Sequence, residues 1–235
     1  MKVLGLDIET SGLSPQKDEI LEIGYSLREY QNSAWSPKAI AQGSFLIWEN
    51  TFPDPMPEEA FAVNQISSTF LKAYGRPYAE VLLNFSAMVS TFMPHFILAH
   101  NGLSFDRPFL EAKGFETNLP WIDSKIHAPY PKKIKGRDLV SLAAHHGFLN
   151  PFPHDALQDI NTMFRVVKDY DFIKMCELAI EPAVWIKAEV KFENKELART
   201  RGYQWSGERK QWEKRVSESE FKVEREEAPF RVSLL

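Results

Sequence analysis

Two carboxylates at the end of a buried strand constrain this chain more than any other feature. Val3, Leu4 and Leu6 predict a core strand, and Asp7 and Glu9 stand two residues apart at its end. Because side chains alternate along a strand, both carboxylates lie on one face of the sheet. Buried charge without a partner is costly, so such a pair needs a cation or a proton. If the strand ends in solvent, the two are ordinary surface acids. Only partner residues elsewhere in the chain can show whether they are surface acids or a cation-binding pair.

The composition is that of an ordinary soluble protein. A chain of 235 residues, 44% of them hydrophobic, is long enough for one sizeable core and a small appendage. Its single cysteine, Cys176, cannot form an internal disulfide or a thiolate metal site alone, which is typical of a reducing compartment. We expect this thiol to be a small buried apolar group. The acids at Asp7 and Glu9 exclude a signal peptide, and we therefore predict a cytoplasmic location.

Residues 81–105 contain no Asp, Glu, Lys or Arg, yet they do not favour a membrane segment. Pro94 divides the run, and polar residues such as Asn84 and His100 interrupt it. The pattern predicts a helix over 78–93 and a buried strand over 96–99.

The rest of the first 180 residues predicts an α/β fold. Three early strands with short connections favour an antiparallel meander, and they are expected over 20–27 and 43–48 besides 2–7. The period then becomes helical. Further helices are expected over 60–63, 69–74 with Ser67 or Ser68 as cap, 105–113 closed by Gly114, 138–146 closed by Gly147, and 156–170. Strands followed by alternating helices and strands predict a mixed sheet flanked by helices.

Partners for Asp7 and Glu9 occur twice more along the chain. Asp106 stands in the first turn of the helix that follows strand 96–99, where an acid alone would be explained by about 0.3–1 kcal/mol of helix-dipole stabilisation. Asp159 lies about one turn into the helix that begins near residue 156, and His154 comes just before that helix. Together, the four acids and the histidine predict an acidic metal cage at one end of the sheet.

These motifs resemble those of the DEDDh family of 3′ to 5′ exonucleases, in the ribonuclease H-like superfamily, which includes proofreading subunits. The resemblance covers about residues 1–175 and implies a ribonuclease H-like fold. Its first motif is Leu6-Asp7-Ile8-Glu9-Thr10, followed by Gly12-Leu13. The second motif is His100-Asn101 with Phe105-Asp106. In the third, the five-residue step from His154 to Asp159 marks the histidine subclass. Between the motifs, Trp121-Ile122-Asp123-Ser124 resembles a further strand of the family.

The resemblance implies two-metal hydrolysis of phosphodiester bonds from a 3′ end, with release of nucleoside 5′-monophosphates. His154 is implied as the general base, because the unperturbed pKa of histidine is near neutrality. Two Mg²⁺ ions, which Mn²⁺ would replace, are expected on four ligands, namely Asp7, Glu9, Asp106 and Asp159.

Three residues are expected to bind substrate. Thr10 and Leu13 resemble the positions that meet the terminal nucleotide, with Leu13 as a wedge, and Asn101 is expected to order the second motif rather than to react. Phe61, Val63 and Ile66 are candidates for a base pocket. The sequence departs from the family there, because Asn64 stands where relatives often carry histidine.

We predict nucleic acid 3′ ends as the substrate, DNA in preference to RNA, with a polymerase or repair protein as a partner and no membrane. An RNA exonuclease and a catalytically silent binding module are the alternatives, since nothing in the motifs reads a 2′-hydroxyl. The net charge of −4 argues against a general cationic binding surface. It does not argue against a nuclease, because catalytic acids lower the formal charge.

The composition changes after about residue 180, so we predict a domain over 1–180 and a small accessory α+β domain over 181–235. The second region holds 12 Lys or Arg against 11 Glu and no Asp. Its expected elements are a strand over 183–192, a helix over 195–201 capped by Asn194, a hairpin through Trp205 and Trp212, and a strand over 221–226. Its basic residues, with Tyr203 and Trp205, could guide DNA, but we favour tryptophans that pack the module's own core.

Overall fold

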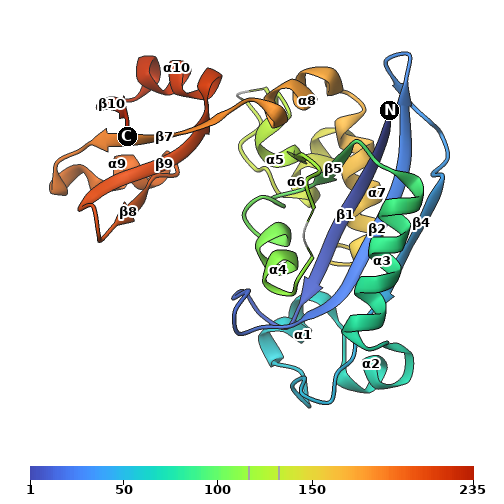
Figure 1. Cartoon of the computed structure of the whole chain (residues 1–235). Coiled ribbons are helices and arrows are strands. Elements are labelled where there is room, and N and C mark those ends of the chain that lie inside the picture. Colours follow the sequence, from blue (N-terminus) through green and yellow to red (C-terminus); the bar gives the residue numbers. More distant parts are fainter. Residues whose placement is uncertain (116, 132) are drawn as a thin grey trace. The chain divides into compact units, whose positions relative to one another are not determined.

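The computed structural model of the chain describes residues 1–115, 117–131 and 133–235. The chain divides into two compact units, Met1–Ala179 and Ile180–Leu235 (Figure 1). Each unit has its own sheet and its own apolar core.

A mixed sheet forms the centre of the first unit. Its strands follow the order β3-β2-β1-β5-β6, and β4 pairs with β2 beside this path. The strands are β1 (Lys2–Thr10), β2 (Ile20–Gln31), β3 (Ala34–Trp35), β4 (Ala41–Leu46), β5 (Phe96–Ala99) and β6 (Trp121–Asp123). The pairs β1–β2 and β2–β4 are antiparallel, which confirms the predicted meander, whereas β1–β5 and β5–β6 are parallel. The short strand β3 was not predicted.

Helices cover both faces of this sheet (Figure 1). They are α1 (Glu58–Asn64), α2 (Ser68–Tyr74), α3 (Tyr78–Phe92), α4 (Asp106–Ala112), α5 (Ser124–His127), α6 (Leu139–His145), α7 (Ala156–Val167) and α8 (Phe172–Ile180). Ser67 caps α2 by accepting from the Phe70 N–H. Gly114 and Gly147 have positive φ after α4 and α6, as the sequence predicted. The predicted long last helix ends at Val167, and α8 follows as a separate helix.

The alternation of β1 assigns its residues to two cores. Leu4, Leu6 and Ile8 belong to the core that α3 covers, together with Phe85. The opposite face of β1 meets α7, and Val3 packs there. This arrangement explains why Asp7 and Glu9 face the helix that carries Asp159.

Two glycines allow α7 to approach the sheet closely. A Cβ atom at Gly5 would lie 2.4 Å from the Phe164 ring, and one at Gly24 would lie 2.7 Å from the Ala156 Cβ. Any larger residue at either position would push α7 away from β1 and β2. The glycines therefore set the distance between the acids of β1 and those of α7.

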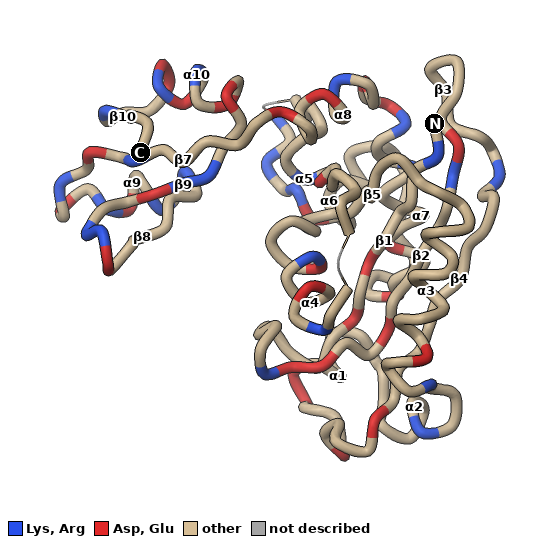
Figure 2. Tube along the Cα trace, in the orientation of Figure 1, with Lys and Arg blue, Asp and Glu red and all other residues tan. Residues whose placement is uncertain are grey.

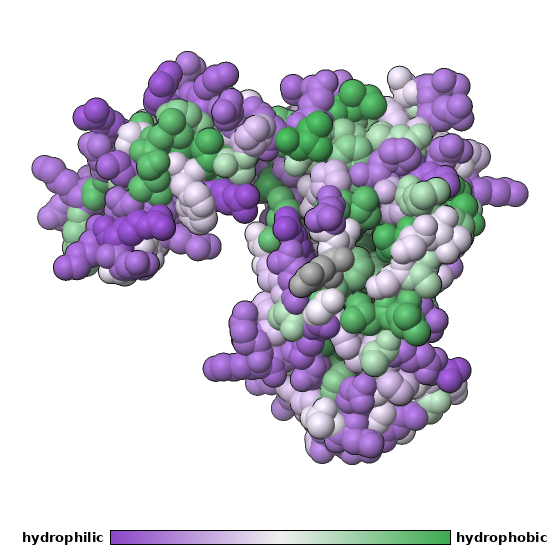
Figure 3. Space-filling model, in the orientation of Figure 1, coloured by the Kyte–Doolittle hydropathy of each residue, from purple (hydrophilic) through white to green (hydrophobic). Residues whose placement is uncertain are grey.

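The second unit is a small sheet with two α-helices and a short 3₁₀ turn among the described residues. The strand order is β10-β7-β9-β8. Its elements are β7 (Ala183–Glu189), η1 (Phe192–Asn194), α9 (Lys195–Thr200), β8 (Gln204–Ser206), β9 (Gln211–Ser217), α10 (Glu218–Glu227) and β10 (Arg231–Leu234). The hairpin of β8 and β9 pairs Trp205 with Trp212, as predicted. Hydrophilic side chains dominate the face of this unit that Figure 3 shows.

Two predictions for this unit were wrong. Residues 221–226 are not a strand but part of α10, because Ser217 and Glu220 form a capping box that starts a helix just before them. Asn194 precedes α9 without a side-chain hydrogen bond to it. Trp212 and Tyr203 are buried in the unit's core, which confirms the packing role that we favoured, whereas Trp205 is about half exposed.

Two further observations concern buried and apolar segments. The Cys176 thiol is buried, and burial raises its pKa to about 11, so it is the inert group that we expected. Across the described residues, no helix combines the length and apolar character needed to cross a membrane.

Candidate active site and metal centre

Three elements bring the predicted acids together at one end of the sheet. Asp7 and Glu9 come from β1, Asp106 from the first turn of α4, and Asp159 from α7. The Ile8 N–H donates to Asp106 Oδ1 over 3.1 Å, which fixes the start of α4 against β1. One ligand atom each of Glu9, His154 and Asp159 lie within 4.8 Å of one another. Acidic residues gather along the end of β1 near α1 in Figure 2.

Burial and mutual repulsion hold protons on these carboxylates. Burial raises the pKa of Asp7 well above its ordinary value, and the charges of Asp106 and Glu9 raise it further. Burial likewise raises the pKa of Glu9 to about 9, followed by repulsion from Asp159. For Asp106, burial raises the pKa to about 7. Without metal, the cluster therefore carries less negative charge near neutral pH than four ionised carboxylates would.

Asp159 is held by neighbours that the sequence did not reveal. Asn150 Nδ2 donates to Asp159 Oδ1 over 2.5 Å, and the His154 backbone N–H donates to Oδ2 over 3.1 Å. Burial raises the pKa of Asp159, although these two hydrogen bonds oppose the shift. No sequence signal pointed to Asn150, because its contact depends on how the loop before α7 closes.

His154 stands exposed at the edge of the cluster. Its φ is +64°, a left-handed conformation that histidine tolerates better than most residues. The next residue, Asp155, caps α7 by accepting from the Gln158 N–H. The turn thus anchors its backbone on Asp159 and α7 while the imidazole stays accessible to solvent.

The donor set fits hard divalent cations. Its carboxylates come from Asp7, Glu9, Asp106 and Asp159, and none of them forms an ion pair with Lys or Arg within 4 Å in the described part of the chain. Buried carboxylates without cationic partners are the ligands that Mg²⁺ and Mn²⁺ prefer. The residues present therefore fit the predicted metal, with a single nitrogen ligand at most from His154.

The expected substrate-binding residues lie around this cluster in different ways. Thr10 is buried, and its Oγ1 donates to the Gly12 carbonyl over 2.6 Å, which shapes the turn after β1. Leu13 projects from that turn with 84% of its surface exposed. Asn101 has a φ of +67° and accepts from Lys125 Nζ over 3.1 Å. Its hydrogen bonds reach α5 and the end of β6, where its N–H donates to Asp123, rather than the four acids of the site.

Asp123 organises the loop that carries Asp106. It is buried at the end of β6 and accepts from the backbone N–H groups of Asn101 and Leu103 over 2.9 and 3.2 Å. His100 joins the same network through Ser124 Oγ, 2.8 Å from its Nδ1. The second motif is therefore supported from β6, a role that the sequence did not predict.

Asn64, the last residue of α1, links that helix to the end of β1. Its Nδ2 donates to the Thr10 carbonyl over 3.1 Å, and its Oδ1 accepts from the Ile66 N–H over 3.0 Å. A hydrogen bond from Asn64 also opposes the rise in the pKa of Glu9. Ile66 is buried, while Phe61 and Val63, the other candidates for a base pocket, are exposed.

Glu22 is a buried acid beside the site that the sequence did not single out. It lies directly opposite Glu9 in the β1–β2 pair and is only 9% exposed. Burial raises its pKa, whereas hydrogen bonds from the Ser44 hydroxyl and the Ala156 N–H lower it. Through Ala156, Glu22 holds the first residue of α7. It also borders a cavity of about 410 Å³, together with Asn64, Ile66, Phe70 and His154.

Comparisons with known proteins bear on both units. The profile described as DNA polymerase family B, exonuclease domain, matches residues 1–126. This match includes Asp7, Glu9 and Asp106 but ends before His154 and Asp159. A domain of unknown function (DUF8626) matches residues 184–235. No curated protein matches the chain.

Solved structures with this fold include two of E. coli exonuclease I and one of a 3′-exonuclease. The zinc-bound complex of E. coli exonuclease I with single-stranded DNA has a TM-score of 0.54 at 15% identity, over 71% of this chain and 39% of that one. The complex of the same enzyme with a dA16 oligonucleotide has a TM-score of 0.57 at 14% identity, over 80% and 48%. A 3′-exonuclease that recognises the histone mRNA stem-loop has a TM-score of 0.55 at 12% identity, over 72% and 80%.

These likenesses show the fold. They confirm the predicted α/β, ribonuclease H-like sheet flanked by helices. The sheet of the second unit confirms the small module at the carboxyl end. The chain spans less than half the length of the E. coli exonuclease I chains that it matches.

Proposed function

Because the chain belongs to the family described as DNA polymerase family B, exonuclease domain, we propose that it is a metal-dependent 3′ to 5′ exonuclease that releases nucleoside 5′-monophosphates. The observation that carries the proposal is the convergence of buried carboxylates from β1, α4 and α7, none of which forms an ion pair with Lys or Arg among the described residues. A structural role would leave these charges uncompensated, whereas a divalent ion compensates them.

The four acids are the proposed metal ligands. When bound, two Mg²⁺ or Mn²⁺ ions supply an activated water and stabilise charge on the attacking and leaving oxygens. Asp7, which faces the charges of Asp106, Glu9 and Asp159, would hold metal together with them. Glu9 and Asp159 would do so beside His154. Asp106 is proposed to act on the second ion, with the Ile8 N–H keeping its carboxylate in place.

His154 is the proposed general base. Its imidazole is exposed beside Glu9 and Asp159, so it can accept a proton from a water at the acids and release it to solvent. Its backbone N–H on Asp159 links the position of the base to that of a ligand. Thr10 and Leu13 are proposed to receive the terminal nucleotide on the turn after β1, and Asn101 to order the loop before Asp106.

DNA is the proposed substrate, because the family is that of a DNA polymerase's exonuclease domain. RNA is the second candidate. The histone mRNA 3′-exonuclease supports it, since this chain covers 80% of that enzyme but less than half of E. coli exonuclease I.

We also propose that residues 1–180 form the catalytic domain and 181–235 an accessory domain. A polymerase or repair protein as partner and a cytoplasmic location complete the proposal. The many charged residues of the accessory unit, 12 Lys or Arg and 11 Glu over 181–235, support a role in an assembly or on a nucleic acid rather than in the chemical step (Figure 2).

The test is mononucleotide release from labelled single- and double-stranded DNA and RNA. Each substrate is incubated with Mg²⁺, with Mn²⁺ and with a chelator. We expect strands labelled at the 5′ end to shorten stepwise from the 3′ end with either ion, and not to shorten with the chelator. Release that persists in the chelator, or internal cleavage without mononucleotides, would contradict the proposal. The ratio of DNA to RNA rates decides between the two substrates.

A further inference from the structure

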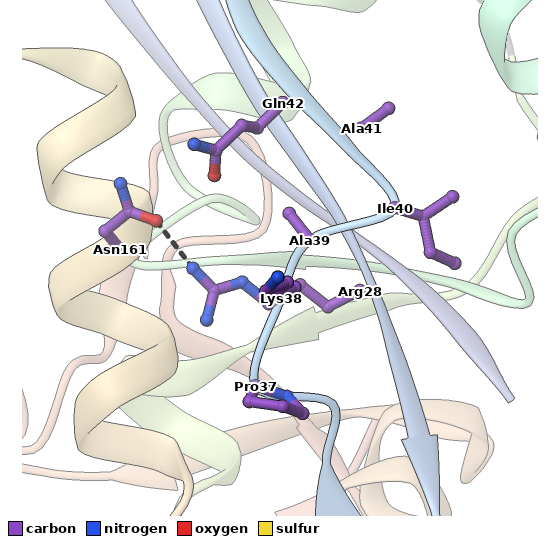
Figure 4. A pocket seen from close by; sticks show the side chains of 8 residues that line it. All are labelled: Arg28, Pro37, Lys38, Ala39, Ile40, Ala41, Gln42 and Asn161. Atoms are coloured by element: carbon purple, nitrogen blue, oxygen red, sulfur yellow. Dashed lines mark hydrogen bonds between the residues drawn. The ribbon is translucent and has the colours of Figure 1, made fainter.

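A second polar cavity lies on β2, at a distance from the acids. Glu22 and Arg28 are on the same face of this strand, because side chains alternate and six residues separate them. At about 3.3 Å per residue, Glu22 is about 20 Å from Arg28 along the strand. Gly24, which pairs with Asp7 of the acid cluster, is about 13 Å from it. The cavity at Arg28 has a volume of about 550 Å³ and lies between β2, the 37–42 segment and α7 (Figure 4).

Neutral groups hold the guanidinium of Arg28 in a defined position. Its Nη2 donates to Asn161 Oδ1 over 2.6 Å (Figure 4). Its Nε donates to Ser26 Oγ over 3.3 Å. Its Cζ lies 4.5 Å from the centroid of the Phe164 ring. Since a guanidinium has five N–H donors, these bonds leave part of the fork available to another acceptor.

Arg28 also lacks a counter-ion. The side chain is half-buried, and no carboxylate lies within 4 Å of it among residues 1–115, 117–131 and 133–235. Burial lowers the pKa of Arg28, and no acid opposes that shift. A partly desolvated cation of this kind gains from an anion more than an exposed one does.

The cavity walls offer further groups of matching chemistry. Lys38 provides a second positive charge, and the side chains of Gln42 and Asn161 provide amide groups (Figure 4). Two cations with amide donors match a dianion that has several acceptor oxygens better than they match a single carboxylate.

We propose that the cavity formed by Arg28, Lys38, Gln42 and Asn161 is a phosphate-binding site outside the acid cluster. The phosphate belongs either to a free phosphate or nucleotide or to the backbone of a nucleic acid strand, and the two sources share this recognition chemistry. The site does not depend on the proposed hydrolysis, because none of its groups belongs to the acid cluster or to His154.

A purely structural role for Arg28 makes a different prediction. In that case its bond to Asn161 only fastens β2 to α7, and substitution changes stability without changing any affinity. The test therefore measures binding in variants that are folded. Lys38 is exposed on a surface segment, so Lys38→Gln leaves the core intact, and Arg28→Met keeps the apolar stem against Phe164. Lys168→Gln, an exposed substitution beyond the end of α7, is the matched control.

The experiment is a titration of the full chain in a chelator, where no hydrolysis occurs. Inorganic phosphate and a nucleoside 5′-monophosphate are added in one arm, and a short single-stranded oligonucleotide in the other. We expect Arg28→Met to weaken one or both arms about tenfold to a hundredfold, as the loss of a charge-assisted hydrogen bond does. Lys38→Gln should weaken the same arm about threefold, and Lys168→Gln should have no effect.

The arms identify the source of the phosphate. If the strand is the ligand, Lys38→Gln also reduces the slope of log affinity against log salt by about 0.7. If free phosphate is the ligand, only the first arm weakens. Unchanged affinity of both arms in Lys38→Gln and in folded Arg28→Met would overturn the proposal. Chain shortening with Mg²⁺ tests the proposed function separately, so either can fail without the other.

Discussion

Buried acids have different partners in the two units. In the second unit, Glu224 accepts two hydrogen bonds of 2.8 Å from Arg201, and Glu213 accepts from Arg209 over 3.1 Å. In the first unit, Glu9 and Asp106 are equally buried, yet neither forms an ion pair with Lys or Arg in the described ranges.

The pKa values follow this difference. Burial alone would raise the pKa of Glu224, but Arg201 and Lys214 reverse the shift and lower it. At Glu9 nothing reverses it, and the pKa rises to about 9. An acid that has an internal partner serves the fold, whereas a buried group of acids without one is ready for a ligand from solvent. Each prediction below tests one side of this comparison.

The largest effect is expected from Asp7→Asn. The change keeps the shape of the side chain but removes the charge that faces Asp106 and Glu9. Because bound metal supplies several kcal/mol of transition-state stabilisation, we expect the exonuclease rate to fall by about a thousandfold or more. Single-turnover hydrolysis measures the loss, and circular dichroism checks the fold. Asp169→Asn, an exposed acid of the same unit, is the control and should keep the wild-type rate. An unfolded Asp7→Asn variant would contradict a ligand role.

His154→Asn should lower kcat by about a hundredfold to ten-thousandfold, the range of general-base catalysis. Asparagine suits the positive φ at this position, and the backbone N–H on Asp159 remains. The metal-induced rise in melting temperature should therefore survive, unlike in Asp7→Asn. His145→Asn, at an exposed histidine of α6, should change neither quantity. If His154→Asn abolishes the metal response as well, His154 is a ligand rather than a base.

Divalent ions should stabilise the first unit, and more so at higher pH. The folded Glu9 keeps its proton up to about pH 9, while an unfolded glutamate loses it near pH 4.5. Between these values the folded state binds more protons, so metal-free stability falls as pH rises. Metal replaces those protons. At a concentration of about a hundred times Kd, we expect a rise of about 5 to 10 °C in Tm at about pH 8, and a smaller rise at about pH 5.5.

Calorimetry with Mg²⁺ and Mn²⁺ measures this shift, and Asp7→Asn is its control. A melting temperature that neither ion changes at any pH would contradict the proposed metal site. Equal shifts at both pH values would mean instead that the carboxylates are already ionised without metal.

Glu224→Gln tests the paired side of the comparison. It removes the charge that Arg201 binds through two hydrogen bonds, and leaves that guanidinium half-satisfied beside α10. We expect the free energy of unfolding of the second unit to fall by about 2 kcal/mol, and hydrolysis of a short oligonucleotide to stay unchanged. Denaturant unfolding followed by tryptophan fluorescence measures the first quantity. Glu226→Gln, at an exposed acid of the same helix, is the control. A loss of hydrolysis would show that this acid is not purely structural.

The sequence predicted the first unit well because its signals are local. Strand 96–99 was predicted to the residue, since an apolar run between Pro94 and His100 leaves little choice. The acids were found through their spacing. In the second unit, apolar residues at Phe221 and Val223 suggested a strand, although Ser217 and Glu220 already carried the capping signal of a helix.

What the sequence could not predict depends on register and loop closure. Strand β2 was expected to end at Leu27, but it continues to Gln31, and that extension brings Arg28 opposite Asn161. Asn150 reaches Asp159 only because the loop folds back before α7. From the sequence, Glu22 is one polar residue in an apolar strand. Its position opposite Glu9 could not be predicted, because the pairing register of β1 and β2 cannot be read from either segment alone.

Glu22 is intermediate between the acids that pair with arginine and the acids of the proposed metal site. Its substitution is expected to have the smallest effect. It is buried like Glu9, but its partners are the Ser44 hydroxyl and the Ala156 N–H rather than a cation or a metal. If it acts as an acceptor that positions the start of α7, Glu22→Ala should lower kcat about tenfold, as loss of a supporting partner does, because His154 and Asp159 lose their anchor. Glu22→Gln keeps an acceptor oxygen and should restore most of the rate, with an unchanged pH profile. Glu29→Ala, at an exposed acid of the same strand, is the control. If Glu22→Gln is as slow as Glu22→Ala, its negative charge matters, and Glu22 belongs with the acids that await a cation rather than with those that hold the fold.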